Sequence, residues 1–336
     1  MAGSLSPTRA GRVHRRLAEH LTLVGAPAAT LGLHWQGAGV RSEAGRCWGR
    51  AAEEADRLHA HREAVSALTH ALDCTDDPQA RFGLRLTQMR HLKALGDLVH
   101  WAEVLETAER ELPPSPSGRE DQVLHLALER THLLWRTGQN EAALAYSAAF
   151  VAGATHPARA ALLHDRAGVL IDLERHAEAQ LALEQAWLHV DDPAGPVAAN
   201  LHNTQAQTAD ALGQLHQGLA HAEQAVRLFQ ALGIWTGVAS ACATSSFLYR
   251  SQGDLLAARS ALEQGLAAAR RAQHLPLQLG SLNLLCEVLL GEGDWSSGLQ
   301  CATAGIELCE QEELQDGLAT FEDWLGRFKA IRVPGV

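Results

Sequence analysis

Along most of the chain, small and apolar residues recur every three or four positions, which is the spacing of one helix face. Ala258, Leu262 and Gly265 follow this pattern, and Gly298 starts the same pattern 40 residues later. Such a stripe buries one face of a helix against its neighbours, while the polar positions between remain in water. The pattern therefore predicts an all-helical chain built from repeated helices of similar length.

Three short turns separate these predicted helices at a constant spacing. They are Gly213-Gln214-Leu215, Gly253-Asp254-Leu255 and Gly293-Asp294-Trp295, and their glycines lie 40 residues apart. Glycine adopts the left-handed conformation at a helix C-terminus without a Cβ penalty, and the polar residue after it can cap the next helix. Leu or Trp then opens that helix on its buried face. A fixed period of this length predicts repeated helix pairs.

Weaker copies of the turn extend the repeat toward the N-terminus. Residues 96–98, 138–140 and 174–176 align with the three turns, so the anchors from position 96 onward are separated by 42, 36, 39, 40 and 40 residues. A single helix pair cannot bury its own apolar stripe, so neighbouring pairs must stack. We therefore predict an all-α, right-handed α-solenoid of about eight helix-turn-helix repeats with a period near 40.

The chain divides into three predicted parts. Residues 1–8 are small and polar, and we expect them to be disordered. Residues 9–75 form an N-terminal helical segment, and residues 76–332 form the repeats of one continuous solenoid.

Composition and charge exclude several classes of function. The net charge is −11, and Lys93 and Lys329 are the only lysines. Proteins that bind nucleic acid through its phosphates need a basic face, so we expect no direct nucleic-acid binding, and we interpret the arginines of residues 9–16 as a solvated helical turn. No apolar run approaches the ~18 residues of a membrane helix, and Glu19 and His20 interrupt the N-terminal apolar stretch. We expect a cytoplasmic protein that does not bind membranes.

The 18 histidines and six cysteines invite a metal or catalytic interpretation. The cysteines lack Cys-x-x-Cys spacing and lie among apolar neighbours, which indicates buried thiols in a reducing compartment. His70 and Cys74 could share one helix face, but the spacing places no third ligand beside them. The sequence contains neither a Gly-x-x-x-x-Gly-Lys-[Ser/Thr] phosphate loop nor a Gly-x-Ser-x-Gly nucleophile turn. We therefore expect no metal, no cofactor and no enzymatic activity.

Two stretches resemble known families. Tyr249 to Ala258 resembles the tetratricopeptide repeat (TPR) pattern Tyr-x-x-x-Gly-[Asp/Asn]-[Tyr/Leu]-x-x-Ala, although Ser245-Ser246 replaces the usual Leu-Gly pair and the family period is about 34. Residues 14–21, followed by His34-Trp35 and the small residues around Trp48, resemble the start of the helical arm of STAND-class regulatory ATPases and related large bacterial transcriptional activators. The resemblance implies a sensing arm without the ATPase and DNA-binding domains.

The first helix of each pair usually lines the concave side of such a solenoid, so its outward stripe predicts a binding groove. Counting back from the turns gives a polar row with isolated aromatic residues. The row comprises Arg90, Lys93, His132, Trp135, His164, Asn203, Gln207, Asp210, Phe247, Arg250, Asn283 and Glu287.

Asn200 and the three residues Asn203, Gln207 and Asp210 fall on one helix face, where amides could bond an extended peptide backbone. An ordinary wet helix face explains the same spacing. Trp135 could be a peptide anchor or fill a gap between repeats, and for Phe247 we expect gap filling.

These patterns predict a non-catalytic scaffold that binds a protein or peptide partner on its concave face, in bacterial regulation. The alternative is a small-molecule sensor arm that controls an ATPase or a transcriptional activator. Self-association through the ends of the solenoid is a further possibility.

Overall fold

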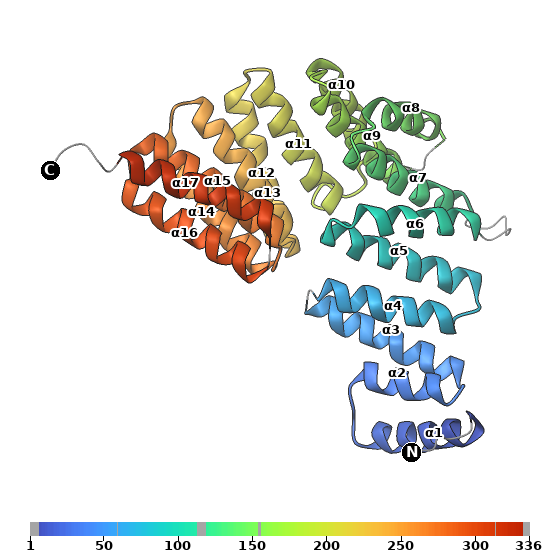
Figure 1. The fold of residues 1–336 in the computed structure, drawn as a ribbon. Helices are drawn as coiled ribbons and strands as arrows, with labels where there is room; N and C mark the ends of the chain where they lie inside the picture. The colour runs from blue at the N-terminus through green and yellow to red at the C-terminus, as the bar shows by residue number, and fades with distance from the viewer. Residues whose placement is uncertain (1–6, 59, 113–118, 154–155, 313, 332–336) are drawn as a thin grey trace. The chain divides into compact units, whose positions relative to one another are not determined.

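The computed structural model describes residues 7–58, 60–112, 119–153, 156–312 and 314–331, and these residues form 17 α-helices (Figure 1). Their bounds are α1 Pro7–Leu23, α2 Ala28–Gly37, α3 Arg41–Arg57, α4 His61–Cys74, α5 Pro78–Leu95, α6 Leu98–Arg110, α7 Arg119–Arg136, α8 Asn140–Val151, α9 His156–Asp172, α10 His176–Trp187, α11 Pro196–Ala211, α12 Leu215–Leu232, α13 Trp235–Ser251, α14 Leu255–Arg271, α15 Leu275–Glu292, α16 Trp295–Gln311 and α17 Gln315–Ile331. The predicted disordered N-terminus lies largely outside the described residues, since α1 begins at Pro7.

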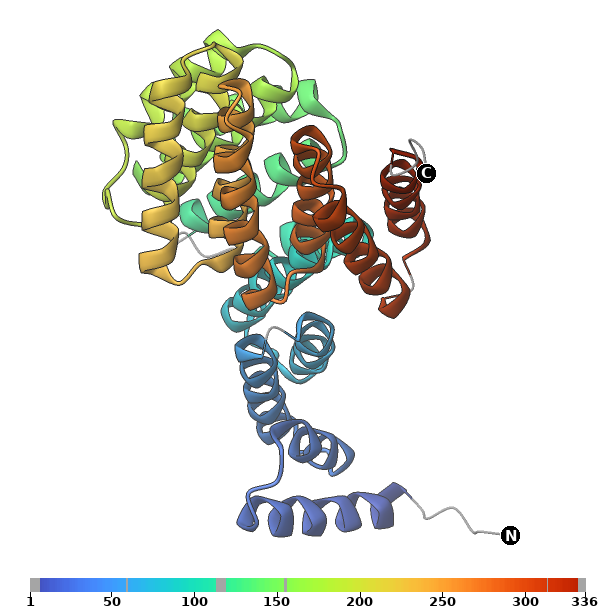
Figure 2. The ribbon, with the colours of Figure 1, turned by 90° about the vertical axis from the view of Figure 1, so that its left-hand side faces the viewer.

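Helices pack in chain order as pairs, and the pairs stack on one another. Within one pair, α13 packs against α14, and α13 also contacts the first helices of the neighbouring pairs, α11 and α15. Helix α15 contacts α17 in the same way. Figure 2 shows the yellow and orange helices side by side. The predicted all-α architecture of stacked helix pairs is confirmed.

The chain divides into two compact units. Unit 1 comprises residues 1–139 and holds α1 to α7, and unit 2 comprises residues 140–336 and holds α8 to α17. No helix among the described residues is both long and apolar enough to cross a membrane.

The glycine turns adopt the conformation that the sequence predicts. Gly213, Gly253 and Gly293 have φ values of 72°, 81° and 75°, which lie in the left-handed region. The same conformation recurs at Gly96 and Gly138 in the weaker copies of the turn. A side chain with a Cβ would be strained at each of these positions, so glycine is what allows one helix to stop and the next to start at once.

The capping prediction holds for aspartate but is wrong for glutamine. The side chains of Asp254 and Asp294 accept hydrogen bonds from the backbone N–H groups of Ala257 and Ser297, at 2.9 and 3.1 Å. Gln214 makes no such bond. Its extra methylene group carries the carboxamide past the N–H groups of the first helical turn, which is why shorter side chains are preferred there.

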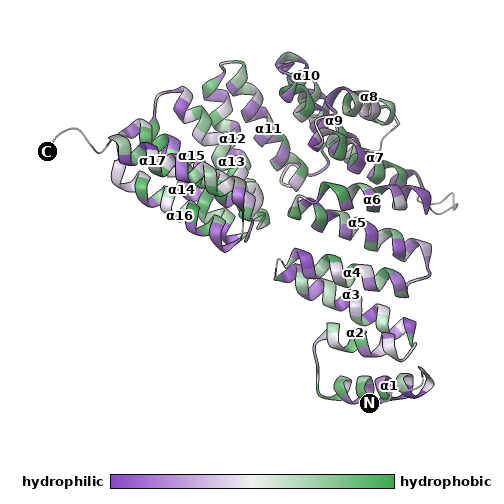
Figure 3. Ribbon diagram, in the orientation of Figure 1, coloured by the Kyte–Doolittle hydropathy of each residue, from purple (hydrophilic) through white to green (hydrophobic). Residues whose placement is uncertain are grey.

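Hydrophobic and hydrophilic positions alternate along the helices (Figure 3), and the buried apolar residues form the cores of both units. In unit 2, Gly298 and Gly305 let α17 approach α16 closely, since a Cβ on these glycines would lie 2.2 and 2.3 Å from the rings of Phe328 and Phe321. Trp295 is only half-buried at the edge of this core. Residues that open a second helix therefore sit at the rim of the core, and the expectation that they are buried is corrected.

All six cysteines are buried and carry free thiols. The thiols lie inside the helix pairs, where the stripe of small residues places them. The predicted burial of the cysteines is confirmed.

Candidate partner-binding face

The residues predicted for the binding row lie on successive first helices, from α5 to α15. Most of them contact a polar residue on the neighbouring first helix, in the next or the preceding pair. We call this series of contacts between first helices the polar ladder, and the solvent-facing side of these helices the first-helix face. Unit 1 and unit 2 each contain their own part of the ladder.

In unit 2, the first steps of the ladder are neutral hydrogen bonds. They join His164 Nε2 to Thr204 Oγ1 at 3.0 Å, Asn203 Nδ2 to Ser240 Oγ at 3.5 Å and Gln207 Nε2 to Thr244 Oγ1 at 3.3 Å. These bonds connect α9 to α11 and α11 to α13. Gln207 is exposed, so its amide oxygen can still accept a hydrogen bond from a ligand, whereas the amide oxygen of Asn203 is buried.

The remaining steps in unit 2 involve charged groups and an indole. The Ser251 hydroxyl donates to Asp210 Oδ1 at 3.0 Å, and Arg250 Nη1 donates to Glu287 Oε2 at 3.1 Å. The last step joins α15 to α17, where Trp324 Nε1 donates to Asn283 Oδ1 at 2.7 Å. The ladder of unit 2 thus continues from α9 to α17 without a missing step.

In unit 1, the ladder consists of ion pairs. Arg90 on α5 donates to Asp56 on α3 at 2.9 Å, and Lys93 on α5 donates to Glu129 on α7 at 2.6 Å. The other carboxylate oxygen of Glu129 accepts a hydrogen bond from Trp101 Nε1 at 3.1 Å. Lys93 and Glu129 are partly shielded, with side chains 29% and 17% exposed, whereas the Arg90 side chain is 60% exposed.

The aromatic residues of the row behave differently from one another. The ring centroids of His132 and Trp135 are 5.6 Å apart, and both side chains are half-buried. Phe247 is 42% exposed, and Cζ of the Arg250 guanidinium lies 5.8 Å from the centroid of the Phe247 ring. The expectation that Phe247 fills a gap between repeats is therefore wrong, because Leu248, which follows it, points into the core instead.

The sequence identified both members of one step of the ladder, Arg250 and Glu287, and only one member of every other step. The partners it missed are Thr204, Ser240, Thr244, Ser251 and Trp324, together with Asp56 and Glu129 in unit 1. In unit 2 each partner follows its predicted residue by 37 to 41 positions, which is one repeat. A polar residue at the same helix position one repeat later is the signal that could have found them.

Histidines face each other in pairs in both units: His14 and His34 in unit 1, with Nδ1 atoms 3.0 Å apart, and two further pairs. His61 and His91 face each other in unit 1 with Nδ1 atoms 3.0 Å apart, and His202 and His221 do so in unit 2 at 2.9 Å. Burial lowers the pKa of His202 to about 4, and burial also lowers the pKa values of His221 and His91. These two further pairs therefore favour the neutral imidazole.

The described residues hold no group of three or more His, Cys, Asp or Glu side chains placed to bind a metal ion. His70, the ligand considered from the sequence, stacks on Trp48 with ring centroids 4.4 Å apart. Two pockets in unit 1 are large enough for part of a ligand. One of about 550 Å³ is lined by residues of α4, α5 and α6, and one of about 420 Å³ lies between α5 and α6.

No protein-family model matches the chain, and no curated protein matches it. Several solved structures resemble it. A Rap protein complexed with competence and sporulation factor is 14% identical, with a TM-score of 0.56 over 86% of this chain and 81% of that one. A tetratricopeptide repeat protein from Parabacteroides merdae is 12% identical, with a TM-score of 0.50 over 83% and 98% of the two chains.

A STAND protein with a tetratricopeptide repeat sensor, from Pyrococcus horikoshii, is 12% identical, with a TM-score of 0.50 over 94% of this chain and 55% of that one. At such low identity the similarities show the fold alone. The chain has the fold of TPR proteins, an α-solenoid of stacked helix pairs.

Proposed function

We propose that the chain is a non-catalytic TPR-like scaffold that binds a protein or peptide partner along its first-helix face, the concave face of the predicted solenoid. The polar ladder is the observation that carries this proposal. It fixes amide, hydroxyl and charged side chains in place before a partner arrives, so little side-chain freedom is lost on binding. Phe247, exposed beside Arg250, supplies an apolar anchor of the kind that dominates peptide interfaces.

A regulatory role is the second part of the proposal. It is supported by the N-terminal resemblance to the arm of STAND-class regulators and by the fold shared with a STAND sensor. The Rap protein of similar fold is bound to competence and sporulation factor, which supports a peptide or protein ligand for this chain as well. The partner would then be sensed by this arm and act on an ATPase or transcriptional activator.

A pull-down with mass spectrometry should identify the partner, and two matched variants test where it binds. Phe247→Ser removes an exposed apolar side chain from the first-helix face, and Leu256→Ser removes one that is 75% exposed on the second helix α14. We expect Phe247→Ser to weaken binding of the identified partner roughly tenfold or more, as expected for an interface anchor. Leu256→Ser should bind like the wild type.

Equal loss in both variants would show non-specific adhesion to apolar surface. Loss in Leu256→Ser alone would place the partner on the second helices and contradict the proposal. The melting temperatures of both variants should match that of the wild type, because each side chain is exposed.

The small-molecule sensor is the second candidate function, and the pocket of about 550 Å³ favours it. Its volume lies within the range of roughly 300 to 1,000 Å³ that is usual for ligand sites, and Leu92, Leu95 and Val104 form an apolar part of its lining. A thermal-shift screen against metabolites separates the two candidates. Stabilisation that is lost in Val104→Arg would favour the sensor.

A further inference from the structure

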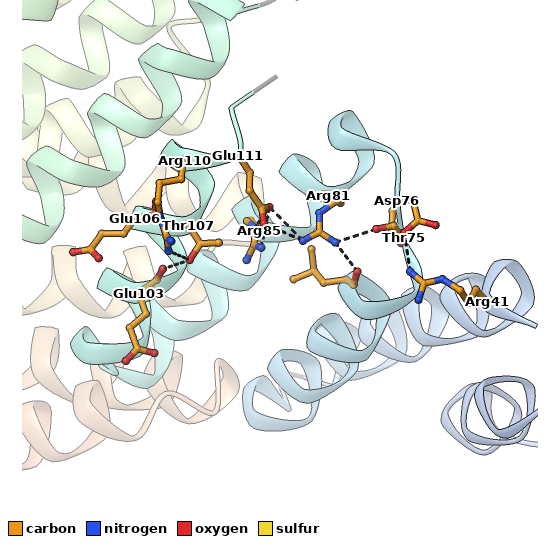
Figure 4. A network of polar contacts seen from close by, with 11 residues as sticks. Arg41, Thr75, Asp76, Arg81, Arg85, Glu103, Glu106, Thr107, Arg110 and Glu111 are labelled. Atoms are coloured by element: carbon orange, nitrogen blue, oxygen red, sulfur yellow. Dashed lines mark hydrogen bonds and ion pairs between the residues drawn. The ribbon is translucent and has the colours of Figure 1, made fainter. Parts of the chain in front are cut away.

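The pocket of about 420 Å³ in unit 1 combines two arginines with an apolar wall, and Figure 4 shows the arginines and their polar partners. Arg81 and Arg85 lie one turn apart on α5, and both point toward Glu111 at the end of α6. Phe82 and Ala108 contribute the apolar lining. The pocket therefore offers two guanidinium groups and a hydrophobic surface side by side.

One carboxylate serves both arginines. Glu111 accepts hydrogen bonds from Arg81 Nη2 at 3.2 and 3.3 Å and from Arg85 Nε at 3.0 Å. The side chain of Arg85 is only 11% exposed, so its charge is largely removed from water. Two positive charges thus share one negative charge in a partly dry site, which favours a further or a better-placed anion.

The neighbouring pair does not correct this imbalance. Arg41 donates to Asp76 at 2.7 Å on the far side of Arg81, and these two charges cancel (Figure 4). Asp76 itself lines the pocket, and with Arg41 counted as its partner the five charged side chains around the pocket carry one net positive charge, in a chain whose net charge is −11.

Arg81 is held in place independently of Glu111. Its Nη1 donates to the backbone carbonyl oxygens of Leu72 and Thr75, at 2.8 and 3.0 Å. The guanidinium therefore keeps its position at the end of α4 when its carboxylate partner is removed. A pre-oriented guanidinium is the feature that bidentate recognition of carboxylates requires.

Glu111, in contrast, is easy to release. It caps the C-terminus of α6, where the helix dipole disfavours a negative charge. Its side chain is 40% exposed, so it can turn into water without being desolvated. Although burial acts to raise it, the hydrogen bonds from Arg81 and Arg85 lower the pKa of Glu111, so it is a carboxylate at neutral pH.

We propose that this pocket binds a carboxylate of the peptide partner, which replaces Glu111 on Arg81 and Arg85 while Phe82 contacts the adjoining apolar part of the peptide. The carboxylate of Glu111 competes with the ligand for Arg81 and Arg85, so anions that bind more weakly than Glu111 do not displace it. The inference rests on the proposed function, because it names the chemistry of the same peptide partner. It places acidic residues, or a C-terminal carboxylate, in the sequence that the scaffold recognises.

The test uses the full chain and a fluorescent octapeptide that contains Leu, Phe, Asp and Glu, with a matched peptide that carries Asn and Gln instead. In fluorescence polarisation, Glu111→Gln should bind the acidic peptide more tightly than the wild type, on the order of tenfold, because the charge-assisted bonds of Arg81 and Arg85 become available to the peptide. Arg85→Gln should lose binding by a similar factor. The amide peptide should bind weakly to every variant.

Glu109→Gln is the matched control, since Glu109 also lies on α6 and pairs with an arginine, Arg130, away from the pocket. It should leave the affinity unchanged. Circular dichroism shows whether Arg85→Gln is folded, and in the double variant Glu111→Gln/Arg85→Gln the competing carboxylate is removed as well. Unchanged affinity in Glu111→Gln, or equal gains in Glu111→Gln and Glu109→Gln, would overturn the inference.

The test of the carboxylate site can fail or succeed independently of the test of the first-helix face. If Phe247→Ser abolishes capture of the partner while Arg85→Gln binds it normally, the scaffold proposal stands and the carboxylate site fails. If the acidic peptide binds with the expected dependence on Glu111 but Phe247→Ser changes nothing, the site stands and the first-helix face is the wrong location.

Discussion

The two units use the same ladder position for different chemistry. In unit 1, successive first helices are joined by charges, Asp56 with Arg90 and Lys93 with Glu129. In unit 2, the steps from α9 to α13 are mostly neutral bonds between amide, imidazole and hydroxyl groups. Salt screens ion pairs, more strongly at the exposed Arg90–Asp56 pair than at the partly shielded Lys93–Glu129 pair, whereas it has little effect on neutral hydrogen bonds. If the proposed binding face is correct, we expect unit 1 to bind charged ligand groups and unit 2 to bind a peptide backbone.

The largest effect should come from the residue where the unit 1 ladder meets the core. Trp101 is 1% exposed, and its indole also donates to Glu129. Trp101→Ala should lower the free energy of unfolding by about 3 to 5 kcal/mol, through the cavity and the lost hydrogen bond. Trp295 in unit 2 is half-buried and is the matched control, for which Ala should cost less than half as much.

Urea unfolding with hydrogen exchange assigned to each unit gives both values on the full chain. Similar costs for the two tryptophans would mean that Trp295 belongs to the core of unit 2 after all.

Acidification should lower the free energy of unfolding by an intermediate amount, and the loss should be larger in unit 2 than in unit 1. Since the pKa of His202 is about 4 in the folded chain and about 6.5 when unfolded, the unfolded state binds more protons between these values. The stabilisation is complete above pH 6.5 and is lost as the pH falls toward 4. At pH 5 the loss should be about 1 to 2 kcal/mol, allowing for partial exposure of the imidazole.

In unit 1, burial and the neighbouring Arg90 lower the pKa of His91, but the carboxylate of Asp56, 3.6 Å from His91 Nε2, opposes them, so we expect acidification to cost less there. Thermal unfolding of wild type and His202→Gln at pH 7.5 and pH 5 measures the difference. The variant should lose less stability than the wild type on acidification. An equal loss in both would show that the histidine pair of unit 2 does not carry the pH dependence.

Much of the fold could be predicted because the information is local and repeated. Gly213, Gly253 and Gly293 each specify a turn by their own backbone, and the apolar period specifies which helix face is buried. The exposure of Phe247 could not be predicted in this way, because it depends on how α13 sits against its neighbours.

The candidate site was predictable only in part, for the same reason. Asn203 and Gln207 were found from their spacing within one helix, but their partners Ser240 and Thr244 lie on another helix. The pocket around Arg81 and Glu111 has no counterpart in the repeat pattern. It forms where the loop before α5 meets α5 and the end of α6, so it depends on contacts between separate segments and not on the apolar period within one helix.

The smallest predicted effect tests the comparison of the two ladders most directly. Lys93→Met removes a partly shielded ion pair from unit 1, and Gln207→Ala removes a neutral step from unit 2. At low salt the first should cost about 1 kcal/mol and the second about 0.5 kcal/mol. In 1 M NaCl the cost of Lys93→Met should fall, because salt already screens the pair in the wild type, while the cost of Gln207→Ala should stay the same.

Chemical denaturation with urea, which adds no ions, at 0.05 and 1 M NaCl provides the measurement. If salt changes the stability cost of Lys93→Met and of Gln207→Ala equally, the ladders of the two units do not differ in their dependence on charge. If salt changes the stability cost of Lys93→Met alone, we expect ligand binding by the two units to differ in its salt dependence as well. Binding through the charged face of unit 1 would then weaken with ionic strength, whereas hydrogen bonding to a peptide backbone in unit 2 would persist.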